Sequence, residues 1–207
     1  MKHKLLADIG NTHFHIYDGN KIIHISHDEA IQTYQNTALY YICVKPSLLA
    51  EIAQNSLWIN IAPKLKLEGS YSSMGIDRQA LCLSRHSGIF IDAGSAITVD
   101  MVEQGVYQGG YILLGLKASI EAYAQISPVL ETTIKPNLSL DTLPKSTKEG
   151  ISYGIIAPIK ALIETQSTSS KPLYFTGGDG AFLASFFEDA IYDEMLVFEG
   201  MESLTMF

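Results

Sequence analysis

The sequence predicts an α/β protein built from two duplicated domains, and two repeated stretches are the main reason. Residues 5–12 and 89–96 each form an apolar, strand-like run that ends in Asp-x-Gly followed by Asn or Ser. Each run continues into further strand-like sequence and then a turn, at 18–20 in the first case and at 103–105 in the second. Both patterns therefore indicate a β-hairpin that carries an acidic, glycine-containing loop.

The spacing of the two hairpins indicates an internal duplication. Asp8 and Asp92 occupy equivalent places in the two stretches and lie 84 positions apart. We therefore predict a first domain over residues 1–85 and a second domain over residues 86–207.

The remaining elements of the first half alternate between strand and helix. The apolar run 38–44 predicts a strand, a helix is expected to begin near Pro46, and a further strand is expected at 57–59. This alternation is typical of an α/β layer.

The second half shows the same mixture of elements. Residues 116–124 have helical composition, whereas 127–144 contains three prolines and is expected to loop across the surface. Ser146 and Glu149 form a capping-box pattern before an apolar helical stretch, and an exposed connector is expected at 165–170. The run 171–175 predicts a strand that leads into the glycine-rich turn Gly-Gly-Asp-Gly.

Composition and charge limit the classes of partner. The chain has 207 residues, of which 47% are hydrophobic, so it can bury a core. Its net charge of −8 and the lack of any basic run make nucleic acid a poor candidate partner. A nucleotide is still compatible with an acidic chain, because backbone N–H groups and a divalent cation can hold phosphates.

The sequence also predicts the cellular setting. The apolar run after Lys4 is too short for a signal peptide, and no run reaches membrane-spanning length. Cys43 and Cys82 form no CxxC pattern or Cys/His cluster, so we expect neither a disulfide framework nor a zinc site. We expect a soluble, reduced, cytoplasmic protein that does not bind membranes.

The Asp-Ile-Gly-Asn-Thr stretch at 8–12 has the chemistry of a phosphate-binding loop. The N–H groups of Gly10, Asn11 and Thr12 could bind phosphate oxygens, while Asp8 could help to hold hydrated Mg²⁺. For one such motif alone, an ordinary tight hairpin is the better explanation. A second copy at Gly94 and Ser95 favours a ligand, because two such loops could grip a polyphosphate from both sides.

The order of the motifs resembles that of a known superfamily. An Asp-x-Gly-Asn-Thr loop, then Asp-x-Gly-Ser, then a strand ending in Gly-Gly at 177–178 is similar to the phosphate-1, phosphate-2 and adenosine series of actin, hexokinase and heat-shock chaperones. This resemblance implies two actin-like, ribonuclease H-like domains with a nucleotide cleft between them. The P-loop signature G-x-x-x-x-G-K-[ST] is absent from the sequence, which excludes a P-loop kinase.

A further motif narrows the resemblance to one family. Gly75-Ile76-Asp77-Arg78 could be no more than a salt bridge at a helix start. Together with the two Asp-x-Gly loops, Gly109-Gly110-Tyr111-Ile112 and Lys145-Ser146-Thr147, it resembles the type III pantothenate kinase pattern in residue type and order. The resemblance covers about residues 5–180.

The resemblance implies a role for each matching position. Asp77 would be the general base that deprotonates the substrate hydroxyl. Pantothenate would contact Tyr71, Gly75, Ile76, Asp77, Arg78 and Thr147. ATP would contact Asp8, Ile9, Gly10, Asn11, Thr12, His13, Phe14, His15 and Ser95. Asp92 would bind a monovalent cation, K⁺ or NH₄⁺, and Asp8 would hold Mg²⁺ through water. The implied enzyme is a homodimer that forms 4′-phosphopantothenate, the first step of coenzyme A biosynthesis.

Some positions depart from the family pattern, and two other functions stay open. Ser95 stands where threonine is common, Leu114 replaces a proline, and Leu81 stands where asparagine is frequent. These departures concern how the substrate is enclosed. The alternatives are another actin-like kinase or phosphatase acting on a sugar, acetate or polyphosphate, and a non-catalytic regulatory protein on the same fold.

Overall fold

The computed structural model describes residues 5–167 and 171–204. The contacts divide the chain into two compact units. Among the described residues, the first consists of 5–86, 102–108 and 195–204, and the second of 87–101, 109–167 and 171–194. The C-terminal segment thus packs with the first unit, and the predicted division at residue 85 stays a prediction.

The first sheet contains five strands in the order β3-β2-β1-β4-β5. Strand β2 pairs antiparallel with β1 and with β3, whereas β4 pairs parallel with β1 and with β5. The strands are β1 (Leu5–Ile9), β2 (Phe14–Tyr17), β3 (Ile22–Ile25), β4 (Leu39–Cys43) and β5 (Trp58–Asn60). The predicted hairpin and both later strands of this half are confirmed.

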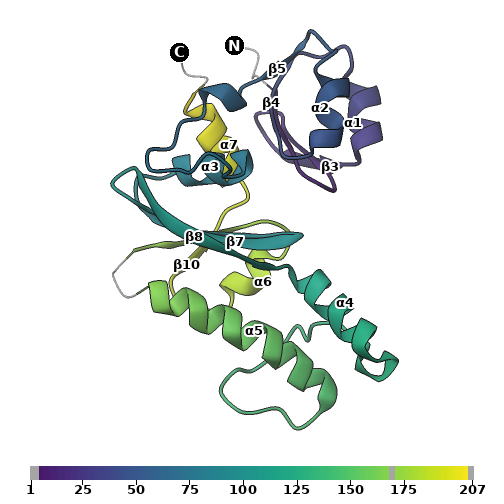
Figure 1. Cartoon of the computed structure of the whole chain (residues 1–207), viewed down its shortest axis with the longest axis vertical. Helices are drawn as coiled ribbons and strands as arrows, with labels where there is room; N and C mark the ends of the chain where they lie inside the picture. The colour runs from purple at the N-terminus through teal and green to yellow at the C-terminus, as the bar shows by residue number, and fades with distance from the viewer. Residues whose placement is uncertain (1–4, 168–170, 205–207) are drawn as a thin grey trace. The chain divides into compact units, whose positions relative to one another are not determined.

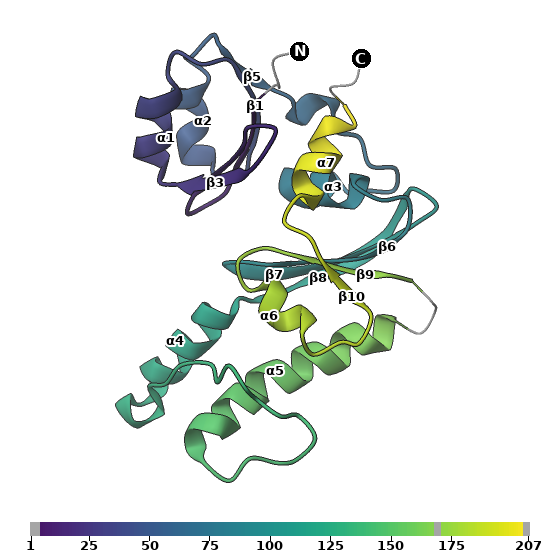
Figure 2. The same ribbon diagram turned by 180° about the vertical axis from the view of Figure 1, so that it is seen from behind.

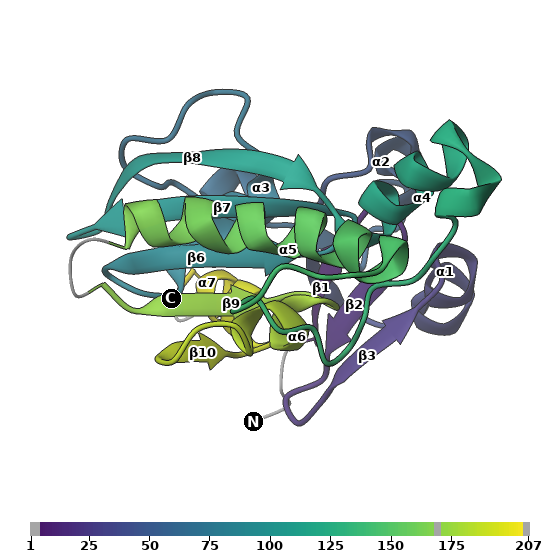
Figure 3. The ribbon, with the colours of Figure 1, turned by 90° about the horizontal axis from the view of Figure 1, so that it is seen from below.

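The second sheet repeats this order. Figure 3 shows its strands running β8-β7-β6-β9-β10 across the sheet, with β6 in the central place that β1 holds in the first sheet. Its strands are β6 (Gly88–Ala93), β7 (Ala96–Glu103), β8 (Val106–Leu114), β9 (Leu173–Thr176) and β10 (Ala190–Tyr192). The same strand order in both halves confirms the predicted duplication and the α/β class.

The turn between β7 and β8 has the backbone of a type I′ hairpin. Gln104 has φ 52° and Gly105 has φ 80°, so both central residues adopt the left-handed conformation. In the first hairpin, the Asp18 carboxylate accepts hydrogen bonds from the N–H groups of Asn20 (2.9 Å) and Lys21 (3.0 Å). Local turn chemistry thus fixes the strand register in both hairpins.

Two helices cover one face of the first sheet. Helices α1 (His27–Tyr34) and α2 (Pro46–Ile52) lie next to one another in Figure 1. Ser26 caps α1 by accepting from the Glu29 N–H, and Pro46 opens α2. The core beneath them consists of Ala7, Ile9, Phe14, Ile16, Ala30, Leu39, Tyr41, Ile52 and Trp58.

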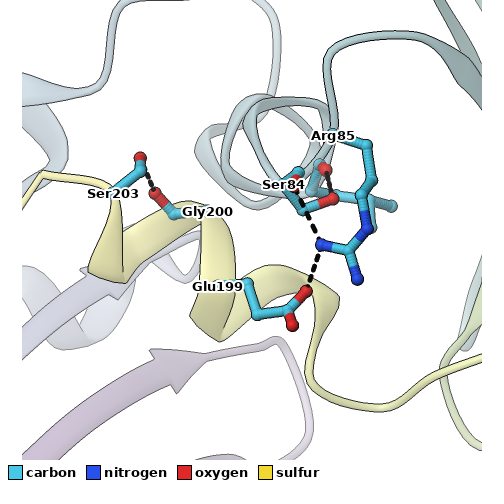
Figure 4. Close-up of polar contacts among 6 residues, drawn as sticks. Ser84, Arg85, Glu199, Gly200 and Ser203 are labelled. Atoms are coloured by element: carbon cyan, nitrogen blue, oxygen red, sulfur yellow. Dashed lines mark hydrogen bonds and ion pairs between the residues drawn. The ribbon is translucent and has the colours of Figure 1, made fainter.

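A second helix pair completes the first unit. Helices α3 (Ile76–Leu83) and α7 (Leu196–Glu202) pack on each other and contact β4 and β1, respectively (Figure 2). An ion pair joins Arg85, which follows α3, to Glu199 of α7, as Figure 4 shows. A short 3₁₀ turn, η1 (Ala62–Lys64), lies in the connection between β5 and α3.

The second unit has one long helix along its sheet. Helix α5 (Thr147–Gln166) runs along one face of the sheet in Figure 3, and its isoleucines join the core of β6 and β7. Ser146 caps it, since its hydroxyl accepts from the Glu149 N–H (3.3 Å) and donates to the Glu149 carboxylate (2.8 Å). The other helices are α4 (Leu116–Ile126), η2 (Pro128–Leu130) and α6 (Gly180–Ala184).

One predicted boundary is wrong. Residues 165 and 166 belong to α5 and not to a connector, because the isoleucine stripe of the helix stays buried as far as Ile163. The rest of the expected connector, 168–170, lies outside the described residues. Within the described part of the chain, no helix is long and apolar enough to cross a membrane.

Candidate functional site

The loop between β1 and β2 presents backbone groups at the surface. The Gly10 N–H donates to the His13 carbonyl (3.0 Å), which closes a tight turn, and the side chains of Asn11, Thr12 and His13 are exposed. Ile9 and Phe14, at the two ends of this turn, are fully buried in the core. These two predicted ATP-contacting residues therefore offer a ligand only their main-chain groups.

Asp8 and His15 are direct neighbours across β1 and β2. Their side chains lie on the sheet face opposite the α1–α2 core, because side chains alternate along a strand and Ile9 and Phe14 point into that core. Asp8 is half-buried, as is His15.

His15 contacts a residue that the sequence did not single out. Its Nδ1 lies 2.6 Å from Nδ1 of His24, its cross-strand partner on β3. Burial, the nearby His24 and then His13 lower the pKa of His15 to about 4. The ring is therefore neutral at pH 7, and only one of the two facing nitrogens carries a proton.

His27 and Lys45 also reach this loop. Nε2 of His27 lies 3.0 Å from the Gly10 carbonyl oxygen, and Nζ of Lys45 lies 3.3 Å from Nδ1 of His27. These residues lie 17 and 35 positions from Gly10, and no motif in the sequence signals the contacts. Only the tertiary structure brings them to the loop.

In the second unit, the ends of β6 and β9 come together. The two strands are parallel, with Asp92 opposite Thr176, so Asp92 and the glycine-rich turn share the carboxyl edge of the sheet. Gly177 has φ 85°, and a side chain there would overlap the Asp92 carboxylate and the Ala93 carbonyl. The Asp179 N–H donates to that same carbonyl (2.9 Å).

The start of α4 lies against the second Asp-x-Gly loop. A Cβ added to Gly115 would lie 2.5 Å from the carbonyl oxygens of Gly94 and Ser95. Glycine at 115 thus lets the first turn of α4 approach this loop, and Ser95 itself is exposed. The partial positive charge at a helix N-terminus favours a phosphate at such a place.

The predicted substrate motif forms the first turn of α3. The Asp77 carboxylate accepts a hydrogen bond from the Arg78 N–H (2.8 Å). It lies over Gly75, where an added Cβ would be 2.5 Å from the same oxygen. Asp77 and Ile76 are half-buried. Glycine at 75 therefore leaves room for the carboxylate at the helix start.

Arg78 connects two tyrosines. It is 5% exposed, and its guanidinium donates to the hydroxyls of Tyr71 (2.8 Å) and Tyr107 (3.4 Å). The two rings are 6.2 Å apart. Tyr71 is 45% exposed, so its ring is accessible to a ligand, while the buried Arg78 holds its hydroxyl.

Tyr107 is a residue that the sequence analysis missed. The Tyr107 N–H donates to the Glu68 carbonyl (2.8 Å). Gly69, at φ 79°, packs against the Tyr107 carbonyl oxygen. The β7–β8 hairpin therefore supports the segment that carries Tyr71. No local pattern links Tyr107 to Arg78, which lies 29 positions earlier.

The predicted residues fall into separate groups. Tyr71 and 75–78 lie together in the first unit, and Asp92 lies with the Gly177 turn in the second. Thr147 is the exposed first residue of α5, also in the second unit. The pairing of Thr147 with Asp77 and the predicted cleft between the domains stay predictions.

The carboxylates fit a metal that is shared with a phosphate ligand. Among the described residues, no group of three or more His, Cys, Asp or Glu side chains could hold a metal ion by itself. Mg²⁺ is usually bound through one or two carboxylates together with substrate phosphates and water. Asp8 and Asp92, each close to the carboxyl end of the central strand of its sheet, match that pattern.

Comparisons with known proteins show the family of this chain. The family model for type III pantothenate kinase matches residues 28–169. A type III pantothenate kinase from Helicobacter hepaticus is 41% identical over 201 residues, which cover 97% of each chain.

Two solved structures extend the comparison. A structure from Campylobacter jejuni, described as that of a Baf family transcriptional activator, has a TM-score of 0.89 at 37% identity and covers 97% of this chain and 96% of its own. MreB 5 of Spiroplasma citri, at 10% identity and a TM-score of 0.50, covers 98% of this chain and 96% of its own, and shares the actin-like fold. The chain therefore belongs to the type III pantothenate kinase family, on an actin-like ATPase fold.

Proposed function

We propose that this protein transfers the γ-phosphoryl group of ATP to the 4′-hydroxyl of pantothenate. The product, 4′-phosphopantothenate, is the first intermediate of coenzyme A biosynthesis. The observation that carries the proposal is the Asp77 carboxylate in the first turn of α3, next to Arg78, which binds the Tyr71 hydroxyl. The chain that holds this motif matches pantothenate kinases over nearly its full length.

Asp77 acts as the general base in this proposal. Its carboxylate is held by the Arg78 N–H at a helix start, so it has little freedom to rotate away from a bound hydroxyl. It orients the pantothenate hydroxyl and accepts its proton as the bond to phosphorus forms. Phosphoryl transfer depends mainly on alignment and charge neutralisation, so no covalent intermediate on the protein is required.

We assign further pantothenate contacts to residues of both units. The exposed Tyr71 ring, oriented by Arg78, forms one wall of the pantothenate site. The backbone of Gly75 and Ile76 and the Thr147 hydroxyl provide further contacts. Because Arg78 is buried and already donates to two tyrosines, its side chain contributes chiefly by holding Tyr71 in place.

ATP is held by backbone groups and carboxylates. The N–H groups of the loop after Asp8 and the Ser95 hydroxyl bind phosphate oxygens. Asp8 would hold Mg²⁺ through water, and Asp92 would hold a monovalent cation. When bound, these cations neutralise the negative charge of the transferring phosphoryl group. We further propose that the enzyme works as a homodimer in the cytoplasm, which mass measurement in solution and cell fractionation would test.

A coupled assay of ADP release with ATP, Mg²⁺ and K⁺ tests the proposal. We expect release that depends on pantothenate and not on sugars, acetate or polyphosphate. Turnover with one of those acceptors instead would assign the chain to another activity of the actin-like kinases.

The relative described as a transcriptional activator supports a second candidate function, that of a regulatory protein. That function predicts ATP binding without turnover. Calorimetric titration with ATP beside the coupled assay separates the two, because only the kinase proposal requires both binding and pantothenate-dependent ADP release.

A further inference from the structure

The Gly10 carbonyl oxygen contacts a side chain that lies outside the β1–β2 hairpin. His27, the first residue of α1, places Nε2 3.0 Å from this oxygen. The His27 ring also packs edge-on against Phe14, at 5.6 Å between centroids, and Phe14 is fully buried. The ring position is thus set by the core, and its nitrogen meets the first Asp-x-Gly loop.

Lys45 fixes which nitrogen of His27 carries the proton. An ammonium group has only hydrogens to offer, so the 3.3 Å contact requires the His27 Nδ1 lone pair as acceptor. In a neutral imidazole the proton then sits on Nε2, which donates to the Gly10 carbonyl. Lys45 is placed for this contact by β4, because the Val44 N–H donates to the Ile9 carbonyl at the end of β1 (3.0 Å).

Peptide geometry links these contacts to the loop's donor groups. In a planar trans peptide, the C=O of Gly10 and the N–H of Asn11 point in opposite directions. A carbonyl held toward His27 therefore directs the Asn11 N–H away from it. The preceding peptide is fixed as well, since the Gly10 N–H donates to His13. A cation at Nδ1 strengthens the Nε2 hydrogen bond through the polarised ring.

We propose that Lys45 and His27 form a relay of positioning residues that orients the Gly10–Asn11 peptide for phosphate binding. Neither residue touches the nucleotide itself. The inference rests on the proposed function, because it takes the triphosphate of ATP as the ligand of this loop.

Four variants test the relay. His27→Phe keeps the ring and its packing on Phe14 but removes both nitrogens. His27→Gln places an amide N–H near the position of Nε2, whereas its matched control, His27→Asn, is too short to reach Gly10. Lys45→Met keeps the aliphatic stem and removes the ammonium.

We expect His27→Phe to raise the Kd and KM for ATP about three- to tenfold, the range of one lost hydrogen bond. The KM for pantothenate and the melting temperature should stay near the wild-type values. His27→Gln should restore most of the ATP affinity, and His27→Asn should not. Lys45→Met should weaken ATP binding in the same direction, and His27→Phe with Lys45→Met should be no worse than His27→Phe alone.

The readouts separate this inference from the proposed function. Calorimetric ATP binding measures the relay without turnover, so an absence of pantothenate-dependent ADP release in the wild type would contradict the kinase proposal only. The relay is overturned if folded His27→Phe binds ATP as the wild type does. It is also overturned if the loss of ATP affinity in the double variant equals the sum, in free energy, of the losses in His27→Phe and Lys45→Met. Should His27→Phe fail to fold, unchanged ATP binding by Lys45→Met overturns it equally.

Discussion

The residues with predicted roles differ in whether their side chains or their backbone can act. Asp77, Asp8 and Asp92 provide carboxylates, whereas Ile9 and Phe14 are buried and can offer only main-chain groups. At the residue scale, this distinction decides which property of the site a substitution tests. Changing a carboxylate tests chemistry, and changing a buried loop residue tests packing.

Replacing Asp77 with Asn should remove the base and leave the nucleotide site intact. The asparagine Oδ1 can still accept the Arg78 N–H, so the first turn of α3 is retained. We expect kcat to fall by about 10²–10⁴-fold because proton removal is lost. Steady-state kinetics measure the fall, and calorimetry should give an unchanged Kd for ATP. Wild-type kcat in this variant would exclude Asp77 as the base.

At the scale of elements, the support of α3 by α7 positions the substrate motif. The backbone of α7 comes so close to α3 at Gly200 that a side chain there would overlap the Ala80 carbonyl. The Arg85–Glu199 ion pair and the bond from the Ser203 hydroxyl to the Gly200 carbonyl (2.7 Å) lie beside this crossing (Figure 4). Since α3 carries Asp77, a displaced α7 would disturb the base.

Gly200→Ala should lower the free energy of unfolding by about 1–3 kcal/mol, because the added methyl group has no space between α3 and α7. Gly150→Ala is the matched control, since a Cβ at that helical position would have no atom within 4 Å other than those of its chain neighbours and its own helix backbone. The control should stabilise the protein by about 0.5–1 kcal/mol through helix propensity. Urea denaturation followed by circular dichroism measures both. Equal, stabilising effects would show that the α3–α7 contact is looser than described.

At the scale of the whole molecule, each unit repeats one sheet with an acidic residue near the end of its central strand. Asp8 on β1 and Asp92 on β6 occupy equivalent places in the two strand orders. The two carboxylates differ in their surroundings. The Gly177 turn packs against Asp92, whereas His15, which contacts His24, is the cross-strand neighbour of Asp8. The two carboxylates therefore have different neighbours.

Replacing Na⁺ with K⁺ or NH₄⁺ at constant ionic strength should raise the initial rate of ADP release, because we assign a monovalent cation to Asp92. The variant Asp92→Asn should lose most of this difference, since the carboxylate charge is gone. Coupled assays in the three chloride salts measure the effect. Equal rates in all three salts would remove the cation from Asp92.

The sequence by itself determined the features that depend on short, contiguous runs of residues. Both hairpins, the duplication and the Ser146 cap could be predicted, because turn, capping and strand patterns depend on neighbouring residues. The end of α5 could not, since burial of its isoleucine stripe, and not local composition, decided where the helix ends.

Tertiary structure alone decided which distant residues support the loops. The contacts of His27 and Lys45 with the Gly10 loop, of Tyr107 with Arg78, and of Gly200 with Ala80 all join segments far apart along the chain. Such contacts depend on strand order, register and helix crossing, which are set by the packing of the whole core and leave no local pattern in the sequence.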